Sequence, residues 1–142
     1  MIQIAIRSTG HRIAFTSGWG ATETTALSTL TYWDTERIGL IGLPPPPDIE
    51  LKMTPAGGEY YELRLRGVTV TPGYYRQLEL THAAFDEEGF YKIGDLGAFV
   101  DDNDPSQGLL FCGRIAEDFK LLTGTFVHVG ELRVGVCCAS PM

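Results

Sequence analysis

The segment TSGWGATE at residues 16–23 holds residue types that could bind a nucleotide. Its glycines permit close approach of the backbone to a ligand, and the flat ring of Trp19 can stack on a base. The hydroxyl of Thr22 suits a phosphate oxygen, and the carboxylate of Glu23 suits Mg²⁺. Taken alone, the segment favours a plainer alternative, a tight turn capped by Thr22.

Asp95 and Arg114 could complete such a nucleotide site. Asp95 follows Gly94 where a strand is expected to end, and its carboxylate could accept hydrogen bonds from two vicinal ribose hydroxyls. Arg114 follows Gly113 at another expected strand end, and its planar guanidinium could reach a ribose or a phosphate. An ordinary turn at Asp95 and a surface ion pair at Arg114 are the alternatives.

Strands are the main elements expected to position these residues. Apolar and polar residues alternate through residues 48–53 and 61–66, and the turn-forming residues 54–58 lie between them, so a hairpin with a loop of several residues is expected. Other expected strands are residues 12–15, 39–43, 90–93, 98–100, 109–115 and 119–129.

Helix signals are confined to residues 22–30 and 74–85. The sequence therefore predicts a mainly β fold, with α+β as the alternative class. The expected form is a small distorted antiparallel β-barrel or sandwich with one or two short helices.

The composition indicates one globular domain over residues 1–142, with 44% hydrophobic and 20% charged residues. The net charge of -7 repels phosphate backbones and anionic lipids, so we expect no nucleic-acid partner and no membrane partner. The start of the chain lacks the features of a signal peptide, which predicts a cytoplasmic protein.

Other reactive or metal-binding residue types favour ordinary roles. The cysteines lack metal-site spacing and are interpreted as reduced thiols, the histidines as surface or half-buried residues, and the acidic residues 101–104 as a solvated turn. The prolines 44–47 are interpreted as a stiff spacer. The cysteines are Cys112, Cys137 and Cys138, and the histidines are His11, His82 and His128.

The nucleotide-type residues lie within longer strings that resemble one enzyme family. The strings are TSGWGATE at residues 16–23, VTPGYY at 70–75, AFDEEGFYKIGD at 84–95 and GRIAEDFK at 113–120. Together they resemble the adenylate-forming acyl- and aryl-CoA synthetases, and most of all the feruloyl-CoA synthetase branch. The resemblance implies that the chain corresponds to the β-rich C-terminal subdomain of the large adenylation domain and ends near the hinge to the small domain.

By this resemblance, ATP or AMP and Mg²⁺ are the implied cofactors. Trp19 would pack on adenine, Thr22 would contact the α-phosphate, and Glu23 would help to hold Mg²⁺. Asp95 would bind the ribose hydroxyls, and Arg114 would complete the nucleotide edge. The hinge falls near Glu117 and Asp118, and the spacing leaves open which of them it is.

The 142 residues lack a Ser/Thr/Gly-rich loop ending in lysine and the catalytic lysine of the family's C-terminal domain. We therefore expect a detached ligase segment without catalytic residues of its own, inactive alone and at most a weak binder of adenine nucleotides. The alternatives are a binding or assembly module, including a homo-oligomer, and a fragment that complements the remainder of a split synthetase.

Overall fold

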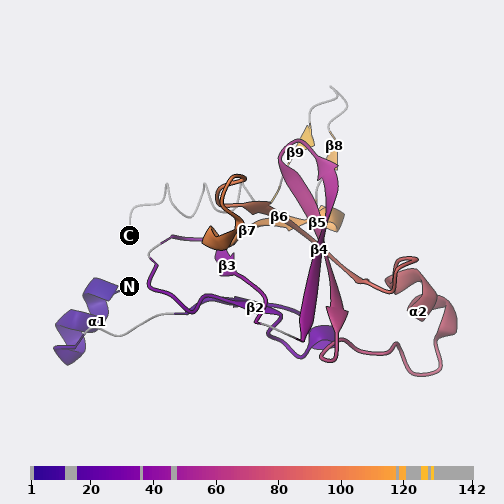
Figure 1. The fold of residues 1–142 in the computed structure, drawn as a ribbon, viewed down its shortest axis with the longest axis horizontal. Helices are drawn as coiled ribbons and strands as arrows, with labels where there is room; N and C mark the ends of the chain where they lie inside the picture. The colour runs from indigo at the N-terminus through magenta and orange to yellow at the C-terminus, as the bar shows by residue number, and fades with distance from the viewer. Residues whose placement is uncertain are drawn as a thin grey trace.

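Antiparallel β-sheet dominates the structure (Figure 1). A computed structural model describes residues 2–11, 16–35, 37–45, 48–117, 119–120, 126–127 and 129. The main sheet has five strands in the order β3-β7-β6-β5-β4. Their bounds are β3 (Leu40–Gly42), β4 (Ile49–Gly57), β5 (Tyr60–Gly67), β6 (Tyr91–Phe99) and β7 (Leu109–Arg114).

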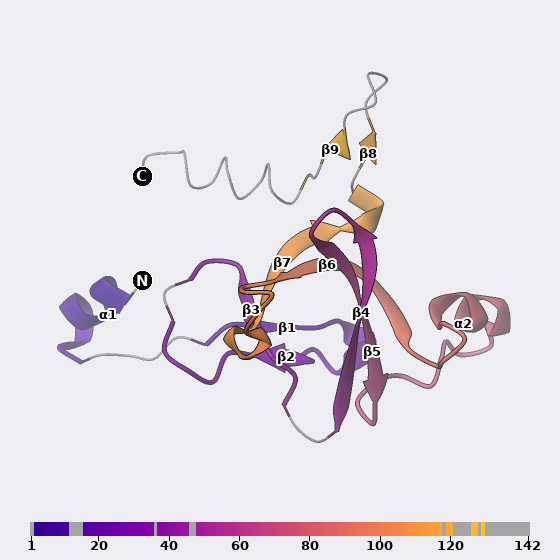
Figure 2. The same cartoon turned by 45° about the horizontal axis from the view of Figure 1, so that its top comes forward.

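Two small sheets and short helices complete the described residues. The strand β1 (Gly18–Trp19) pairs with β2 (Thr29–Leu30), and β8 (Phe119–Lys120) pairs with β9 (Phe126–Val127). The α-helices α1 and α2 lie at opposite ends of the molecule, outside the sheet (Figures 1 and 2). The helices are α1 (Ile2–Thr9), α2 (Leu78–Ala84) and the 3₁₀ turns η1 (Thr22–Thr24), η2 (Pro105–Gln107) and η3 (Ile115–Glu117).

The mainly β class is confirmed. Within the described residues, however, the five-stranded sheet stays open, with β3 and β4 at its edges, so the expected barrel does not close. The same residues contain no helix that is both long enough and apolar enough to cross a bilayer.

The expected hairpin is confirmed as β4 and β5, with Leu51 opposite Leu65. Its loop is shorter than expected because residues 54–57 continue β4 and only residues 58–59 form the turn. Pro55 lies in an edge strand and beside a register shift between Pro55 and Gly57, which are the places where a sheet tolerates proline.

The segment around Asp95 differs from the prediction. The two strands expected at residues 90–93 and 98–100 are one continuous strand, β6, so Asp95 lies inside a strand and not at its end. Gly94 keeps the strand continuous in a left-handed conformation, with φ 80°, that other residues rarely adopt. The predicted end of a strand at Arg114 is confirmed, since Arg114 is the last residue of β7.

The helix expected within residues 22–30 is reduced to the 3₁₀ turn η1. Thr25 and Ala26 have positive φ angles of 57° and 68°, which ends any right-handed helix at that point. The second expected helix is confirmed in part as α2, and α1 was not anticipated.

Several predictions fall on residues outside the described ranges. These are the strand at residues 12–15, the last two prolines of the spacer, and Asp118, His128, Cys137 and Cys138. The single strand expected at 119–129 is wrong, because its described parts are β8 and β9, which pair with each other as antiparallel strands. His11 and His82 are exposed, as expected for surface histidines.

The hydrophobic core packs against one face of the main sheet. Leu63 and Leu65 of β5 and Leu109 of β7 are almost completely buried, and Trp19 packs into the same cluster. Because side chains alternate between the two faces of a strand, the neighbours of Leu63 and Leu65 on β5 are charged and lie on the other face. Each buried leucine contributes roughly 1.5–3 kcal/mol relative to an exposed one.

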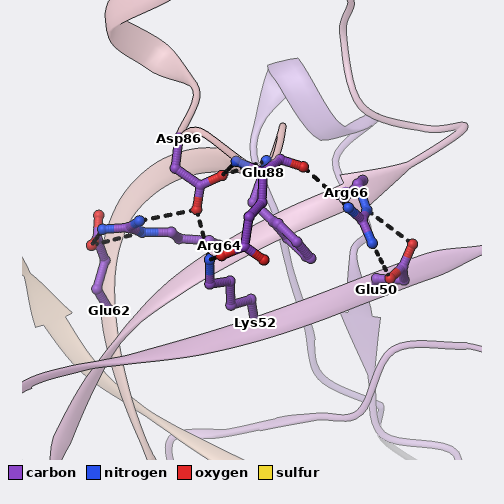
Figure 3. A network of polar contacts seen from close by, with 8 residues as sticks. Glu50, Lys52, Glu62, Arg64, Arg66, Asp86 and Glu88 are labelled. Atoms are coloured by element: carbon purple, nitrogen blue, oxygen red, sulfur yellow. Dashed lines mark hydrogen bonds and ion pairs between the residues drawn. The ribbon is translucent and has the colours of Figure 1, made fainter.

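The charged face is organised around Asp86, in the turn that precedes β6 (Figure 3). Lys52 and Arg64 are direct cross-strand neighbours of like charge, a pairing that destabilises a sheet on its own. The Asp86 carboxylate accepts a hydrogen bond from each of them, at 3.0 Å in both cases. Its other oxygen accepts the backbone N–H groups of Glu88 and Phe90 at 3.0 and 2.9 Å. The turn is therefore fixed to the hairpin by charge.

Candidate functional site

Three of the predicted site residues meet at Asp95. The indole N–H of Trp19 donates to Asp95 Oδ2 at 2.7 Å, and Arg114 Nε donates to Asp95 Oδ1 at 2.8 Å. Asp95 is buried, at 5% exposure, and Trp19 is buried, at 8%. Residues from three distant segments thus form one polar cluster.

The sheet positions this cluster. Asp95 on β6 lies directly opposite Arg114 on β7 in the antiparallel ladder, so their ion pair spans adjacent strands. Trp19 is placed by the pairing of β1 with β2 and by a 2.8 Å hydrogen bond from the Ser28 N–H to its carbonyl oxygen. The Arg114 side chain is 53% exposed and forms the open side of the cluster.

Among the described residues, the buried carboxylate of Asp95 accepts hydrogen bonds from two side-chain donors, one of them cationic. The hydrogen bond to Asp95, and then the charge of Asp95, raise the pKa of Arg114 above its usual value. A carboxylate can accept about four hydrogen bonds, so Asp95 retains acceptor capacity for a vicinal diol. Only 8% of the Asp95 side chain is exposed, so a ligand could reach the carboxylate only through this small exposed part.

Trp19 has a structural role in this arrangement. Its ring belongs to the hydrophobic core and its N–H is bonded to Asp95. The stacking of adenine on this ring stays a prediction.

Glu23 and Thr22 belong to a separate element, η1. No hydrogen bond or ion pair within the described residues joins either of them to Asp95. Thr22 is exposed and Glu23 is half-buried. The Glu23 carboxylate accepts a 3.0 Å hydrogen bond from the Tyr74 hydroxyl.

The loop that carries Glu23 is held by Thr24, a residue that the sequence analysis did not select. The Thr24 hydroxyl accepts the N–H of Ala21 at 2.9 Å and is buried. A tight turn is therefore present, but Thr24 braces it and not Thr22. Gly20 is required by packing within this loop, since a Cβ atom there would lie 2.6 Å from the carbonyl oxygen of Ala26.

Two tyrosines beside Glu23 were also missed. The hydroxyls of Tyr74 and Tyr91 lie 3.2 Å apart, and Tyr91 is buried. Burial raises the pKa of Tyr91, the hydrogen bond with Tyr74 and the charge of Glu23 add to this effect, and Arg114 opposes it. Both tyrosines lie within the family-like strings, but their contacts span distant positions that a linear pattern does not reveal.

Glu23 fits the chemistry of a magnesium ligand in one respect. Within the described residues, no group of three or more histidine, cysteine, aspartate or glutamate side chains could hold a metal. Mg²⁺ usually keeps several waters and takes one or two carboxylates together with the phosphates of a substrate. A single half-buried carboxylate at Glu23 is consistent with that mode of binding.

Other predicted features have ordinary surroundings. Glu117, one of the two hinge candidates, is half-buried at the end of η3. Cys112 is half-buried in β7, with its sulfur 3.6 Å from the carbonyl oxygen of Leu110.

Sequence comparison relates the chain to ligases that form CoA thioesters. No family model matches the chain. Phenylacetyl-CoA ligase epaB of Aspergillus niger is 35% identical over 91 residues, which cover 58% of this chain and 17% of the ligase. Long chain acyl-CoA synthetase 5 of Arabidopsis thaliana is 30% identical over 129 residues, covering 81% of this chain and 18% of the synthetase. The chain therefore spans less than a fifth of these relatives.

Solved structures agree with the sequence comparison. ATP-bound MatB from Rhodopseudomonas palustris superposes on 99% of this chain with a TM-score of 0.73 and 26% identity, and the match covers 27% of MatB. The unliganded O-succinylbenzoate coenzyme A synthetase MenE from Bacillus subtilis shares the fold, with a TM-score of 0.74 at 23% identity, over 29% of its length. The relatives and structural neighbours named here are thus AMP-forming acyl-CoA ligases and synthetases, of which this chain matches one segment.

Proposed function

We propose that the chain is a segment of an acyl-CoA ligase that keeps the ribose side of an adenine-nucleotide site. It binds AMP or ATP weakly and does not form an acyl-CoA alone. The observation that carries this proposal is the convergence of Trp19, Asp95 and Arg114 from three separate segments. Structures matched by this chain include ATP-bound MatB and MenE in complex with AMP, which supports the choice of ligand.

Each candidate residue takes one role in this proposal. Asp95 accepts the ribose hydroxyls, and the half-exposed Arg114 contacts the ribose or a phosphate. Trp19 holds Asp95 and lies at the adenine side. Thr22, which is exposed, contacts the α-phosphate, and Glu23 contributes to Mg²⁺ binding.

We propose no catalysis by this segment alone. Adenylation requires the pyrophosphate leaving group to be held and its charge neutralised in the transition state. The chain corresponds to 17–18% of the relatives described above, and it offers one side of a nucleotide site. For the parent enzyme we propose an aromatic acid substrate of the feruloyl type, which the similarity to a phenylacetyl-CoA ligase supports.

Calorimetric titration tests the nucleotide proposal. AMP, ATP with Mg²⁺ and a non-hydrolysable acyl-adenylate analogue are added to the wild type, Asp95→Asn and the control Asp102→Asn, whose carboxylate lies in an exposed turn. We expect saturable binding with a Kd of about 1 mM, or roughly -4 kcal/mol, in the wild type and the control. Asp95→Asn should bind much more weakly. A folded wild type without saturable binding, or equal binding by Asp95→Asn, would contradict the proposal.

A second candidate function is assembly, either as a homo-oligomer or with the remainder of a split synthetase. The apolar side chains of Val68, Tyr75 and Leu78 are 84%, 82% and 76% exposed and are therefore available to a partner. An apolar cleft of about 340 Å³ also lies on the core side of the sheet, lined chiefly by Leu43, Leu51, Met53, Phe99 and Leu109.

Sedimentation velocity over a hundredfold range of concentration tests assembly. A homo-oligomer should show a rising sedimentation coefficient in the wild type and a smaller rise in Leu78→Ser. A sedimentation coefficient that stays at the monomer value would exclude the homo-oligomer. Co-purification with a separately encoded ligase fragment would then test the split enzyme.

A further inference from the structure

Glu23 is held at two points by the segment that follows β5. Its carbonyl oxygen accepts the N–H of Thr71 at 2.7 Å, and its carboxylate oxygen Oε1 accepts the hydroxyl of Tyr74 at 3.0 Å. Both the backbone and the side chain of Glu23 are therefore restrained by residues 71–74, although the carboxylate belongs to another loop.

Tyr74 is itself fixed in place. Its N–H donates to the hydroxyl of Thr81 at 2.9 Å, which connects it to α2. Its phenol oxygen lies 3.2 Å from that of Tyr91, a buried residue at the start of β6 whose ring packs edge-on against Phe85.

The two hydrogen bonds of the Tyr74 hydroxyl have a fixed direction. An ionised carboxylate only accepts, so the single O–H of Tyr74 donates to Glu23. Tyr91 must then donate its own O–H to the oxygen of Tyr74. The hydrogen bonds from Tyr91 to Tyr74 and from Tyr74 to Glu23, called the tyrosine relay below, thus hold the carboxylate in one orientation. Tyr91 is fixed because it is buried in the core.

This orientation leaves a defined position for a cation. Oε1 of Glu23 is bonded to Tyr74, whereas Oε2 accepts no hydrogen bond from the described residues. A carboxylate that binds a divalent cation through one oxygen while the other is held by a hydrogen bond is typical of supported metal ligands.

We propose that Tyr74, supported by Tyr91, is a positioning residue that orients Glu23 so that its other carboxylate oxygen, Oε2, binds a divalent cation. Because Tyr91 and Asp95 share β6, the tyrosine relay also sets the position of the cation ligand relative to the ribose ligand. This inference rests on the proposed nucleotide site. It adds to that site the two tyrosines that orient the proposed metal ligand, Glu23.

The direct test uses Mn²⁺ alone as the probe, with the full chain and no nucleotide. Paramagnetic broadening of the backbone amide signals of residues 22–24 is measured in the wild type, Glu23→Gln, Tyr74→Phe and Tyr91→Phe. Tyr75→Phe is the matched control, because it removes a hydroxyl from a neighbouring tyrosine that is 82% exposed.

We expect broadening in the wild type and in Tyr75→Phe, and its loss in Glu23→Gln. Tyr74→Phe should need about 2- to 10-fold more Mn²⁺ for the same broadening, because it loses one hydrogen bond. Tyr91→Phe should also need more Mn²⁺ than the wild type, but the increase should be smaller. The dispersion of the amide spectrum identifies any variant that fails to fold. If Tyr74→Phe does not fold, Tyr91→Phe tests the proposal in its place, since it leaves the contact between Tyr74 and Glu23 intact.

Absence of broadening in the wild type, or equal broadening in wild type and Tyr74→Phe, would overturn the inference. A parallel AMP titration without metal separates it from the nucleotide proposal. Tyr74→Phe should keep the wild-type affinity for AMP, which Asp95→Asn should lose. A wild type that is broadened by Mn²⁺ but does not bind AMP would refute the nucleotide site while leaving the role of Tyr74 intact.

Discussion

The indole N–H of Trp19 donates a 2.7 Å hydrogen bond to the buried carboxylate of Asp95, 76 residues further along the chain. This bond ties the loop of residues 16–23 to the central strand β6. It also means that two residues selected for ligand chemistry support the folded state, so a variant at either position changes stability as well as binding. Stability must therefore be measured alongside any loss of affinity.

Trp19→Phe should lower the free energy of unfolding by more than the loss of ring area alone. The change removes the N–H, and among the described residues it leaves the buried carboxylate with Arg114 as its remaining side-chain donor. A hydrogen bond to a charged group contributes about 1.5–3 kcal/mol. Urea denaturation of the wild type and the variant measures the difference.

Trp33→Phe is the matched control, since it removes the same atoms from a half-buried tryptophan that has no hydrogen-bond partner among the described residues. We expect Trp19→Phe to cost about 1–3 kcal/mol more than Trp33→Phe. Equal costs would mean that the bond to Asp95 contributes nothing.

The hairpin could be predicted from sequence because its pattern is local. Alternation of apolar and polar residues sets which side chains face the core, and Leu51 and Leu65 do lie opposite each other. Strand propensity, also a local property, placed Arg114 at the end of a strand. Asp95 was misplaced because Gly94, which usually signals a turn, here continues a strand with a positive φ.

The candidate residues could be selected by family resemblance, but their partners could not. The contacts of Asp95 with Trp19 and of Glu23 with Tyr74 join positions 76 and 51 residues apart, and these pairings depend on strand order. The expected helix after Thr22 stops at η1 because Thr25 and Ala26 take positive φ angles, which local propensity does not reveal. Thr24 was missed because a buried hydroxyl that braces a loop has no distinctive sequence pattern.

Asp86 should make the stability of the protein depend on acidic pH. Burial raises its pKa, but hydrogen bonds from the Phe90 N–H, Lys52, Arg64 and the Glu88 N–H outweigh this effect and hold the pKa well below the usual 3.8. A lowered pKa in the folded state adds stability above the unfolded pKa, and this stability is lost as the pH falls toward the folded value.

Asp86→Asn should therefore be less stable than the wild type near neutral pH, and the gap should narrow between about pH 5 and pH 2. Urea midpoints measured across this range check the prediction. Asp102→Asn, at an exposed position, should follow the wild-type pH profile. A constant gap between wild type and Asp86→Asn would show that the charge of Asp86 is not what fixes the turn.

Leu63→Ala should test whether the five-stranded sheet is the source of stability in the isolated chain. Leu63 is fully buried in the core, so the change leaves a cavity and should cost about 2–5 kcal/mol. Leu80→Ala makes the same change on α2, where the side chain is 47% exposed, and should cost much less. Thermal unfolding followed by circular dichroism compares the two. Similar costs would mean that the sheet does not form a cooperative core in solution.

Gly20→Ala should distort the loop that presents Thr22 and Glu23. A Cβ atom at residue 20 would lie 2.6 Å from the carbonyl oxygen of Ala26 and 2.8 Å from its carbonyl carbon, so backbone atoms must move. Overpacking of this kind costs about 1–3 kcal/mol. Gly58→Ala is the comparison, because it also adds a methyl group but meets nothing within 4 Å, and only its positive φ opposes the change. We expect a larger fall in the urea midpoint for Gly20→Ala, together with shifted amide signals at residues 22–24. Because Ala26 belongs to the same loop, unchanged signals there would contradict the close packing on which the position of Glu23 depends.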